Sequence, residues 1–347
     1  QMCIRDSSSI DWCCLPQFDS SAIFCKIIDN HIGGSFKIEA DESYIITQQY
    51  INNTAVVRTN FKNEKNEFEV LDFMTRYKLD DQNFYSPPEI QRLIKPITGL
   101  PKIKVLYNPT LEYANGKTKT YEKEDFIVSV FDEASYETLF LYTDIEKKKI
   151  LENKEFELSK SVYLNLSYNE KIDLPSLSKS EEELKKTQDY WLNWCKKSPS
   201  FKSYNKEITR SSITLKLLTF EKTGAVLAAA TTSIPETIGE VRNWDYRFCW
   251  IRDASMVIKI IAKLGHHRIV KNFIDFIVNL IPNKNEKLQI MYGIDGQKTL
   301  TEKILKHLSG YKNSKPVRIG NAAFIQKQND IYGILVDAIH FQIEKFK

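Results

Sequence analysis

Short runs of β-branched and aromatic residues recur from Ile10 to about Asn169, with turn residues between them. Such runs favour strands, because branched and aromatic side chains pack well on a pleated surface. The dipeptide Asn115-Gly116 predicts a two-residue hairpin turn, since that turn needs positive φ at both positions. Several strands spaced by about ten residues are typical of a β-sandwich. The clearest candidates are Lys102–Tyr107, Phe126–Phe131, Thr138–Tyr142 and Val162–Leu166.

Beyond the polar segment Ser167–Ser180, which contains Pro175, the pattern changes to helical spacing. Ser180 followed by three glutamates is a good helix start, because a capping residue precedes acids in the first turn. The predicted organisation is a β-sandwich over residues 8–170, a linker at 171–180 and a helical domain over 181–347. Long loops rich in aromatic and charged residues separate the helices, as in a barrel of paired helices whose loops form a site at one end. The helical segments are Glu181–Lys197, Glu207–Phe220, Ala254–Leu264, Ile269–Leu280, Leu300–Leu308 and Ala322–Lys345.

The charges nearly balance, since 49 Lys and Arg face 45 Asp and Glu and give a net charge of +4. This gives no electrostatic case for a nucleic-acid or membrane partner, and no apolar run approaches the ~20 residues of a membrane span. The six cysteines show neither a CxxC pair nor metal-site spacing. We therefore expect reduced thiols in a cytoplasmic protein.

Both ends of the sequence are unusual. Gln1 stands where an initiator Met is expected, and residues 1–7 show no structural pattern, so we expect a non-native leader there. Phe341–Lys347 continues a helical pattern without a Gly or Pro stop signal, which predicts a chain cut within a helix.

The segment Gly224–Asp253 carries the candidate chemistry. Its last part, Asn243–Asp253, holds four aromatic rings, two arginines and two aspartates, and an apolar helix follows. Sugars need this combination, because their C–H faces pack on aromatic rings while their hydroxyls need fixed donors and acceptors. Arg supplies a rigid fork of donors and Asp supplies charged acceptor oxygens. The alternative is structural: Arg252-Asp253 as an ion pair at a helix start, with the tryptophans as core anchors.

The same segment resembles the first signature of glycoside hydrolase family 15, which contains glucoamylases, glucodextranases and bacterial and archaeal trehalases. The resemblance rests on AAATTSIPE (Ala228–Glu236) and RNWDYRFCWIRDAS (Arg242–Ser255). It extends over nearly all of residues 8–347. Further matching segments are Ser9–Phe24, Asp72–Met74, Gln91–Gly99, Leu288–Gly296, His307–Tyr311 and Lys315–Gly333.

The resemblance implies an amino-terminal β-sandwich followed by an incomplete (α/α)6 barrel. By the same resemblance, Tyr246 and Trp250 line the first sugar site, and Arg252 and Asp253 hold the hydroxyls of its glucose. Lys315 stands where many relatives have Arg, and it would lack the bidentate fork. Two further substrate-binding candidates, for which a structural role is an equal alternative, are Arg318 and Asn321.

Enzymes of the family invert configuration with two glutamates, one as acid and one as base. The resemblance places both after the segment QNDIYG, beyond which only Ile334–Lys347 follows. We therefore expect no catalytic residue in this chain, and Glu236, Glu240 and Glu344 do not occupy the places of the acid and base. The 347-residue chain itself is expected to be inactive.

The predicted function is that of an exo-acting hydrolase releasing glucose from α-glucans or trehalose, so the expected partner is an oligosaccharide or disaccharide of glucose. A non-catalytic carbohydrate-binding or regulatory protein of the same fold is the alternative. We expect no cofactor and no metal, because the adjacent His266 and His267 would point in different directions on a helix. The sequence leaves the oligomeric state and the choice between glucoamylase, trehalase and glucodextranase open.

Overall fold

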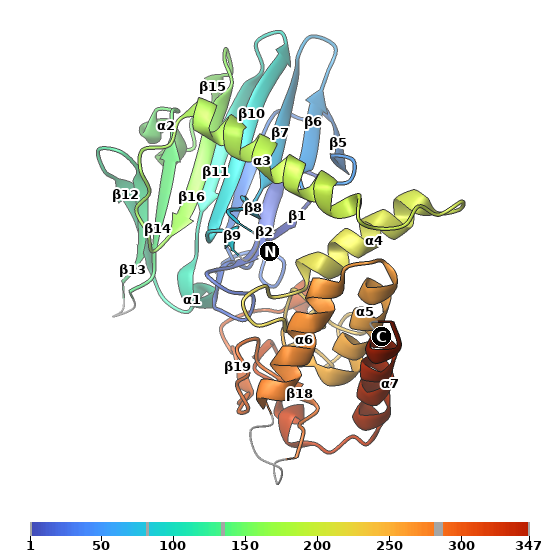
Figure 1. Ribbon diagram of the computed structural model, residues 1–347. Helices are drawn as coiled ribbons and strands as arrows, with labels where there is room; N and C mark the ends of the chain where they lie inside the picture. Colours follow the sequence, from blue (N-terminus) through green and yellow to red (C-terminus); the bar gives the residue numbers. More distant parts are fainter. Residues whose placement is uncertain (1, 81–82, 133–135, 281–286, 346–347) are drawn as a thin grey trace. The chain divides into compact units, whose positions relative to one another are not determined.

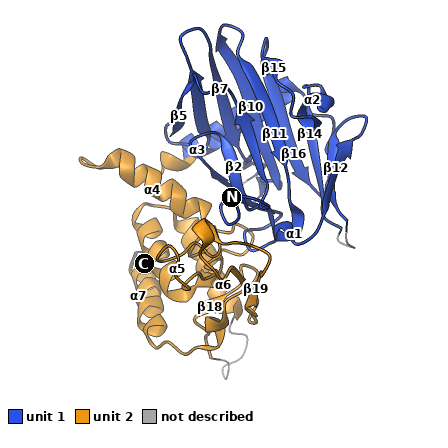
Figure 2. Cartoon of the chain, turned by 180° about the vertical axis from the view of Figure 1, so that it is seen from behind, with its two compact units in different colours: residues 1–193 blue, residues 194–347 orange. Residues whose placement is uncertain are grey.

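The computed structural model describes residues 2–80, 83–132, 136–280 and 287–345. The chain forms two compact units, Gln1–Asn193 (unit 1) and Trp194–Lys347 (unit 2), shown in separate colours in Figure 2. Unit 1 is rich in β-strands and unit 2 is largely helical. The division between the compact units lies after Asn193, and the predicted linker at 171–180 falls within unit 1.

Two antiparallel sheets make up most of unit 1 (Figure 1). The six-stranded sheet has the order β1-β2-β4-β11-β15, with β3 paired to β2, and the eight-stranded sheet has the order β12-β13-β14-β16-β10-β7-β6-β5. The strands of the first sheet are β1 (Met2–Ile4), β2 (Ser9–Cys14), β3 (Ala22–Phe24), β4 (Ser35–Glu39), β11 (Lys102–Asn108) and β15 (Phe156–Glu157). Those of the second are β5 (Ile45–Tyr50), β6 (Val57–Lys62), β7 (Glu67–Phe73), β10 (Glu89–Thr98), β12 (Thr118–Glu122), β13 (Ile127–Phe131), β14 (Thr138–Thr143) and β16 (Val162–Tyr168).

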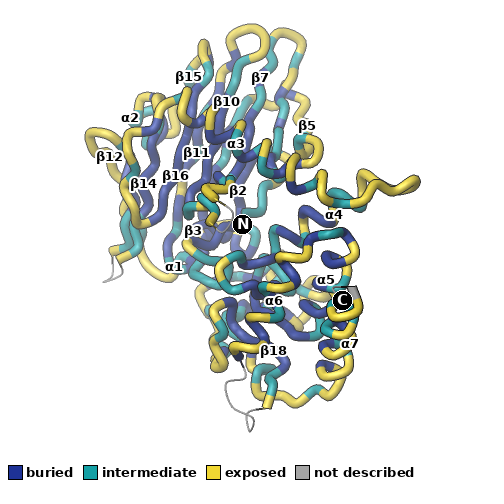
Figure 3. Tube along the Cα trace, viewed as in Figure 1, coloured by how far each residue is buried: buried dark blue, intermediate teal, exposed yellow. Residues whose placement is uncertain are grey.

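The two sheets share one apolar core, to which both contribute fully buried residues such as Ile10, Phe36, Val70 and Ile94. In Figure 3 the strands are dark where they face this core and light at their tips. The predicted strands from 102, 126, 138 and 162 are all confirmed, as β11, β13, β14 and β16. Two sheets packed face to face around one core are a β-sandwich, and this arrangement accounts for the alternation of buried and more exposed residues along β11.

One buried arginine joins the two sheets inside that core. Arg92 on β10 donates from Nε to Asp72 Oδ1 on β7 at 2.6 Å, and both residues are fully buried. Its other nitrogens donate to the carbonyl oxygens of Phe36 and Ser8, each at 2.6 Å, in the facing sheet region. The guanidinium therefore bridges the sheets through charge-assisted bonds, which are stronger than neutral ones.

The outer face of the eight-stranded sheet is covered by helix α3 (Leu177–Cys195), which Figure 1 shows running across it. Leu184 and Leu177 pack on Leu93 and Phe73 of the sheet. The backbone N–H of Arg76 donates to Thr187 Oγ1 at 3.1 Å, which fastens the helix further. Most of α3 belongs to unit 1 for this reason, and α3 begins inside the segment predicted as a linker.

Three further predictions differ from the structure. Residues 2–4 of the predicted leader form β1, which pairs with β2. Asn115-Gly116 does not close a hairpin: Asn115 has φ −87° and follows helix α1 (Leu111–Ala114), where Glu112 and Tyr113 take the positive φ values instead. Residues 300–308, predicted as a helix, contain the short strand β19 (Lys303–Ile304). The remaining elements of unit 1 are β8 (Tyr77–Lys78), β9 (Phe84–Tyr85) and α2 (Lys147–Leu151).

Unit 2 is organised around helix α5 (Ile251–Lys263), which packs against α4 (Asn205–Leu217), α6 (His267–Leu280) and α7 (Asp330–Lys345). The predicted helices from 207, 254 and 269 are confirmed, whereas the one from 322 is divided into the 3₁₀ turn η2 (Ala322–Ile325) and α7. The short elements of the loops are β17 (Cys249–Trp250), β18 (Met291–Tyr292), β20 (Arg318–Ile319), which pairs with β19, and the 3₁₀ turn η1 (Tyr311–Asn313).

The six cysteines are all free thiols. Within the described residues, every helix is too short or too polar to span a lipid bilayer.

Candidate functional site

The predicted site residues gather at the amino-terminal end of α5. Trp250 caps this helix in an extended conformation, with φ −78° and ψ 120°. It is held there by pairing of β17 with β18 and by the Ile251 N–H, which donates to the Ile290 carbonyl at 2.9 Å. Asp253 lies in the first turn, where the helix dipole favours an acidic side chain.

Two aromatic rings lie next to each other at this helix end. The rings of Tyr246 and Trp250 are 6.1 Å apart and inclined at 56°. Trp250 is only 8% exposed, and its buried Nε1 has no hydrogen-bond acceptor within the described part of the chain. The Arg252 guanidinium lies 5.7 Å from the Trp250 ring centroid, so the charged and aromatic groups are contiguous.

Arg252 lies between two carboxylates. Its Nη2 is 3.3 Å from Asp253 Oδ2, and its Nη1 is 3.5 Å from Asp330 Oδ2 at the start of α7. Nη1 also donates to Gln328 Oε1 at 3.4 Å. The side chains of all three charged residues are between 35% and 44% exposed, so they are accessible to a ligand. Asp330 and Gln328 belong to the matched segment Lys315–Gly333, but nothing in their spacing relative to α5 indicated this contact.

Tyr246 is joined to the other side of the cluster by Glu236. The Tyr246 hydroxyl donates to Glu236 Oε1 at 3.4 Å, and Arg242 Nε is 3.0 Å from Glu236 Oε2. Burial raises the pKa of the Tyr246 hydroxyl, and the nearby Glu236 carboxylate and, more weakly, Asp253 raise it further. The structure therefore brings together Tyr246, Trp250, Arg252 and Asp253, with Glu236, Asp330 and Gln328 as neighbours.

The same segment contains a second Arg–Asp pair that is buried. Arg247 Nε and Nη2 donate to the two carboxylate oxygens of Asp245 at 2.9 and 2.8 Å, and the pair is at most 1% exposed. Asp245 also accepts from the Gly320 N–H at 3.2 Å. Asp245 and Arg247 thus form a buried structural ion pair, and Arg252 and Asp253 also form the ion pair at a helix start that the structural alternative described.

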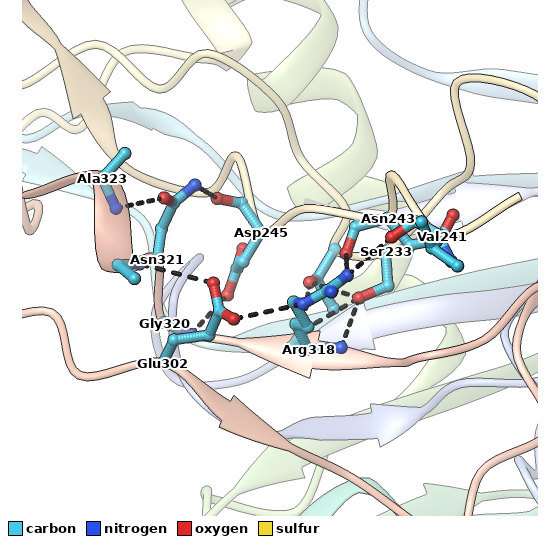
Figure 4. Close-up of polar contacts among 11 residues, drawn as sticks. Ser233, Val241, Asn243, Asp245, Glu302, Arg318, Gly320, Asn321 and Ala323 are labelled. Carbon is cyan, nitrogen blue, oxygen red and sulfur yellow. Dashed lines mark hydrogen bonds and ion pairs between the residues drawn. The ribbon is translucent and has the colours of Figure 1, made fainter.

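Arg318 and Asn321 are engaged within the protein (Figure 4). Arg318 Nε donates to Glu302 Oε1 at 3.1 Å, and its Nη1 donates to the carbonyl oxygens of Val241 and Asn243. Asn321 donates from Nδ2 to the Asp245 carbonyl at 3.0 Å, while its Oδ1 accepts the Ala323 N–H at the start of η2. These bonds hold the loop of residues 233–245 against the segment 302–323.

Lys315 is exposed, and none of its hydrogen bonds or ion pairs joins it to the cluster at α5 within the described residues. The seven predicted site residues are therefore of two kinds. Four lie at one helix end, where Tyr246, Arg252 and Asp253 are partly exposed and Trp250 is buried, and Lys315, Arg318 and Asn321 lie in the segment that supports the neighbouring loop.

His266 and His267 do not act together. The His266 ring stacks on Trp194 with centroids 3.7 Å apart, and its Nε2 is 2.9 Å from Ser198 Oγ. Burial lowers the pKa of His266 to about 4, and the positive charges of Lys197 and Lys216 add to this shift. Across the described residues, no group of three or more His, Cys, Asp and Glu side chains is arranged to hold a metal ion.

Comparison with known proteins identifies two models along the chain. Residues 202–345 match the family described as glycosyl hydrolases family 15, and residues 3–161 match the family described as trehalase-like, N-terminal. The two together define a glycosidase-family helical segment preceded by a trehalase-type β-domain. The chain therefore contains a glycosyl hydrolase family 15 domain preceded by a trehalase-like N-terminal domain.

Several curated relatives carry the name trehalase. The relative from Thermoplasma acidophilum is 33% identical over 98% of this chain and 58% of its own length. "Trehalase 1" of Sulfolobus acidocaldarius is 32% identical over 96% of this chain and 57% of its own length, and the Mycobacterium tuberculosis trehalase is 28% identical over 97% and 53%. The chain thus spans about half the length of the curated relatives it matches.

Proposed function

We propose that this chain supplies the glucose-binding surface of a trehalose hydrolase. The observation that supports the proposal is the grouping of Tyr246, Trp250, Arg252 and Asp253 at the accessible start of α5. The name trehalase borne by the relatives favours trehalose over longer α-glucans. In this proposal the ring face of a glucose unit packs on Tyr246 and Trp250, because C–H groups and aromatic faces are complementary.

The charged residues would supply the polar part of the same site. Arg252 is already held in position by Asp253 and Asp330, so little side-chain entropy is lost when a sugar hydroxyl replaces a water beside it. Asp253 offers carboxylate oxygens that accept hydroxyl protons, and such charge-assisted bonds are stronger than neutral ones. A site of this kind rejects analogues that lack the hydroxyl, because its own polar groups would then stay unpaired.

The proposal includes the fold that the family resemblance implies for the helices. The four helices α4 to α7 would be part of an (α/α)6 barrel. Exposed apolar side chains on α5 and α7, including Met256, Ile260, Val336 and Ile343, support this, because such residues usually pack against further helices.

The proposal also includes the chemistry of the complete enzyme. Inverting glycosidases need an acid and a base carboxyl on opposite sides of the scissile bond. The resemblance places neither of these glutamates in the present chain, so we expect it to bind trehalose without hydrolysing it.

Sugar binding tests the first part. Trehalose and maltose would be titrated into the protein by calorimetry, with Asp253→Asn as the variant and Asp275→Asn as the matched control. Asp275 is an exposed aspartate on α6, and its ion-pair partner Lys271, at 2.8 Å, belongs to the same helix. We expect Asp253→Asn to weaken binding at least about tenfold, as loss of one charge-assisted bond predicts. Equal affinities of the two variants would overturn the site.

Glucose release tests the second part. Incubation of the chain with trehalose or maltose is expected to give no glucose above the background. Clear turnover would show that a catalytic pair lies among residues 1–347 and would refute the expectation of inactivity.

A further inference from the structure

A polar pocket lies in unit 1 between the outer face of the eight-stranded sheet and helix α3. We call it the α3 pocket. Its polar lining comes from Tyr85, Glu89, Gln91, Asn165, Ser180 and Glu183. Beside the pocket, an apolar cluster that includes Leu71, Phe73 and Leu93 of the sheet packs on Leu184 of α3.

Strand register explains why these side chains meet. Glu89 and Gln91 are two residues apart on β10 and so point to the same face of the sheet as Leu93. Asn165 on β16 is the direct cross-strand partner of Gln91, and such partners lie close together in antiparallel sheets. Glu183 reaches the same place from α3, which covers this face.

The pocket contains unsatisfied acceptors. Gln91 and Asn165 are 3% and 4% exposed, and neither Gln91 Oε1 nor Asn165 Oδ1 has a hydrogen-bond donor within the described residues. The same holds for Glu183 Oε2. Their amide nitrogens are already committed, since Gln91 Nε2 donates to Thr75 Oγ1 at 2.8 Å and Asn165 Nδ2 donates to Glu89 Oε2 at 3.4 Å. The amide oxygens are therefore the atoms left over.

Unpaired buried acceptors destabilise a protein unless a water or an ion satisfies them. Glu89 and Glu183 are 5% and 8% exposed, so the same small space also holds two buried carboxyl groups. Burial raises the pKa of both, which disfavours their charged forms. One oxygen of Glu183, Oε1, accepts from the Tyr77 hydroxyl at 3.3 Å and lies 3.9 Å from Lys186 Nζ, so Oε2 is the oxygen left for a cation. Lys179, which also lines the pocket, is exposed at its edge.

The size of the pocket limits the ligand. Its cavity volume is about 30 Å³. A water needs about 10–15 Å³ of such space, so a single ion with one or two waters fits, whereas a sugar ring does not. Hard divalent cations bind carboxylate oxygens, amide oxygens and waters together, with six to eight oxygen ligands in the case of Ca²⁺.

We propose that the α3 pocket is a binding site for a divalent, oxygen-preferring cation of the Ca²⁺ type. The carboxylates of Glu89 and Glu183 supply two negative charges, and the amide oxygens of Gln91 and Asn165 supply neutral ligands. The cation joins α3 to strands β10 and β16, so its role is to hold the helix on the sheet. Only two of the four protein ligands are acidic, and side-chain amides complete the set.

Metal binding to the whole chain tests the proposal. Protein stripped with EDTA would be titrated with CaCl2 by calorimetry, and its thermal unfolding would be followed with and without Ca²⁺. We expect one Ca²⁺ per chain and a rise in Tm of about 5–10 °C when Ca²⁺ exceeds its Kd a hundredfold. KCl at equal ionic strength is expected to give no such rise. Absence of Ca²⁺ binding, or the same response to K⁺, would overturn the proposal.

Variants on neighbouring positions of α3 locate the site. Glu183→Gln is expected to weaken Ca²⁺ binding at least tenfold, since it removes one of two charged ligands. Glu182→Gln is the matched control, because Glu182 is exposed and pairs with Lys186 at 2.9 Å. Glu89→Gln removes the second carboxylate from the strand side, so it tests the site independently of the helix. Unchanged binding in both Glu183→Gln and Glu89→Gln would place the cation elsewhere. No sugar is present in these measurements, so their outcome is separate from that of the glucose site.

Discussion

Replacing Asp245 with Asn is expected to destabilise unit 2 by about 3–5 kcal/mol, because it removes one partner of a buried ion pair. Asp245 Oδ1 accepts from Arg247 Nε at 2.9 Å and from the Arg247 N–H at 3.1 Å. Its Oδ2 accepts from Arg247 Nη2 at 2.8 Å and from the Gly320 N–H at 3.2 Å. An Asn amide that keeps the first oxygen must place its NH2 group against two donors.

The magnitude follows from these contacts. Two of the bonds are lost, one of them to a charged donor, and a hydrogen bond to a charged group contributes about 1.5–3 kcal/mol. The buried guanidinium also loses its neutralising charge. Together these losses give the expected destabilisation of about 3–5 kcal/mol. Asp253→Asn is the matched control, because Asp253 is 43% exposed and lies 3.3 Å from a half-exposed Arg252. An exposed pair of this kind contributes about 0.2–1 kcal/mol.

Urea denaturation measures the difference. The signals would be tryptophan fluorescence, with Trp244 and Trp250 flanking the pair in sequence, and far-ultraviolet circular dichroism. With a urea m-value of about 2 kcal/mol/M, Asp245→Asn should lower the midpoint by roughly 2 M, while Asp253→Asn should leave it nearly unchanged. The reasoning fails if the two variants are equally stable, or if Asp253→Asn is the more damaging.

Three other outcomes are expected. The pKa of His266 in the fold is about 4, against about 6.5 when unfolded, so the unfolded state binds more protons between these values and stability should fall by up to about 3 kcal/mol as the pH drops from 6.5 to 4. His266→Gln should flatten that part of the stability–pH curve, and an unchanged slope would contradict the assignment. Leu184→Ala should cost about 2–5 kcal/mol by leaving a cavity under α3, whereas Leu192→Ala, at a 38% exposed position of the same helix, should cost less than about 0.5 kcal/mol in urea denaturation. Gly224 and Gly239 have φ of +88° and +87°, but a Cβ would lie 2.4 Å from the backbone of α6 only at Gly224; thermal unfolding should therefore show Gly224→Ala to be clearly less stable than Gly239→Ala, and equal Tm values would rule out the clash.

The spacing of apolar residues predicted the type of element correctly where one face of a strand or helix is buried against a single layer. The strands around Val105 and Leu164 and the helices around Ile258 and Phe273 follow this rule, and each lies where its period placed it. The segment 300–308 shows the limit. Its apolar residues have helical spacing, but Ile304 is 50% exposed and pairs in a strand with Arg318, a cross-strand contact that the spacing within the segment does not encode.

The sequence predicted which residue types form the site, but not which of its two Arg–Asp pairs is buried and which is exposed. Asp245–Arg247 and Arg252–Asp253 have the same residue types within nine positions. The first pair is buried because Gly320 and Asn321 close over it, and these residues come from a loop some seventy positions away. Spacing along the chain carries no signal for such a closure, and the same holds for the approach of Asp330 to Arg252.

Strand β10 presents Arg92 to the space between the sheets and Glu89 and Gln91 to the opposite surface. Inserting or deleting a single residue there would exchange these two sets of side chains, placing the Arg92 guanidinium under α3 and the amide of Gln91 between the sheets beside the Asp72 carboxylate. A one-residue change in the length of β10 would therefore leave mismatched side chains on both of its faces at once.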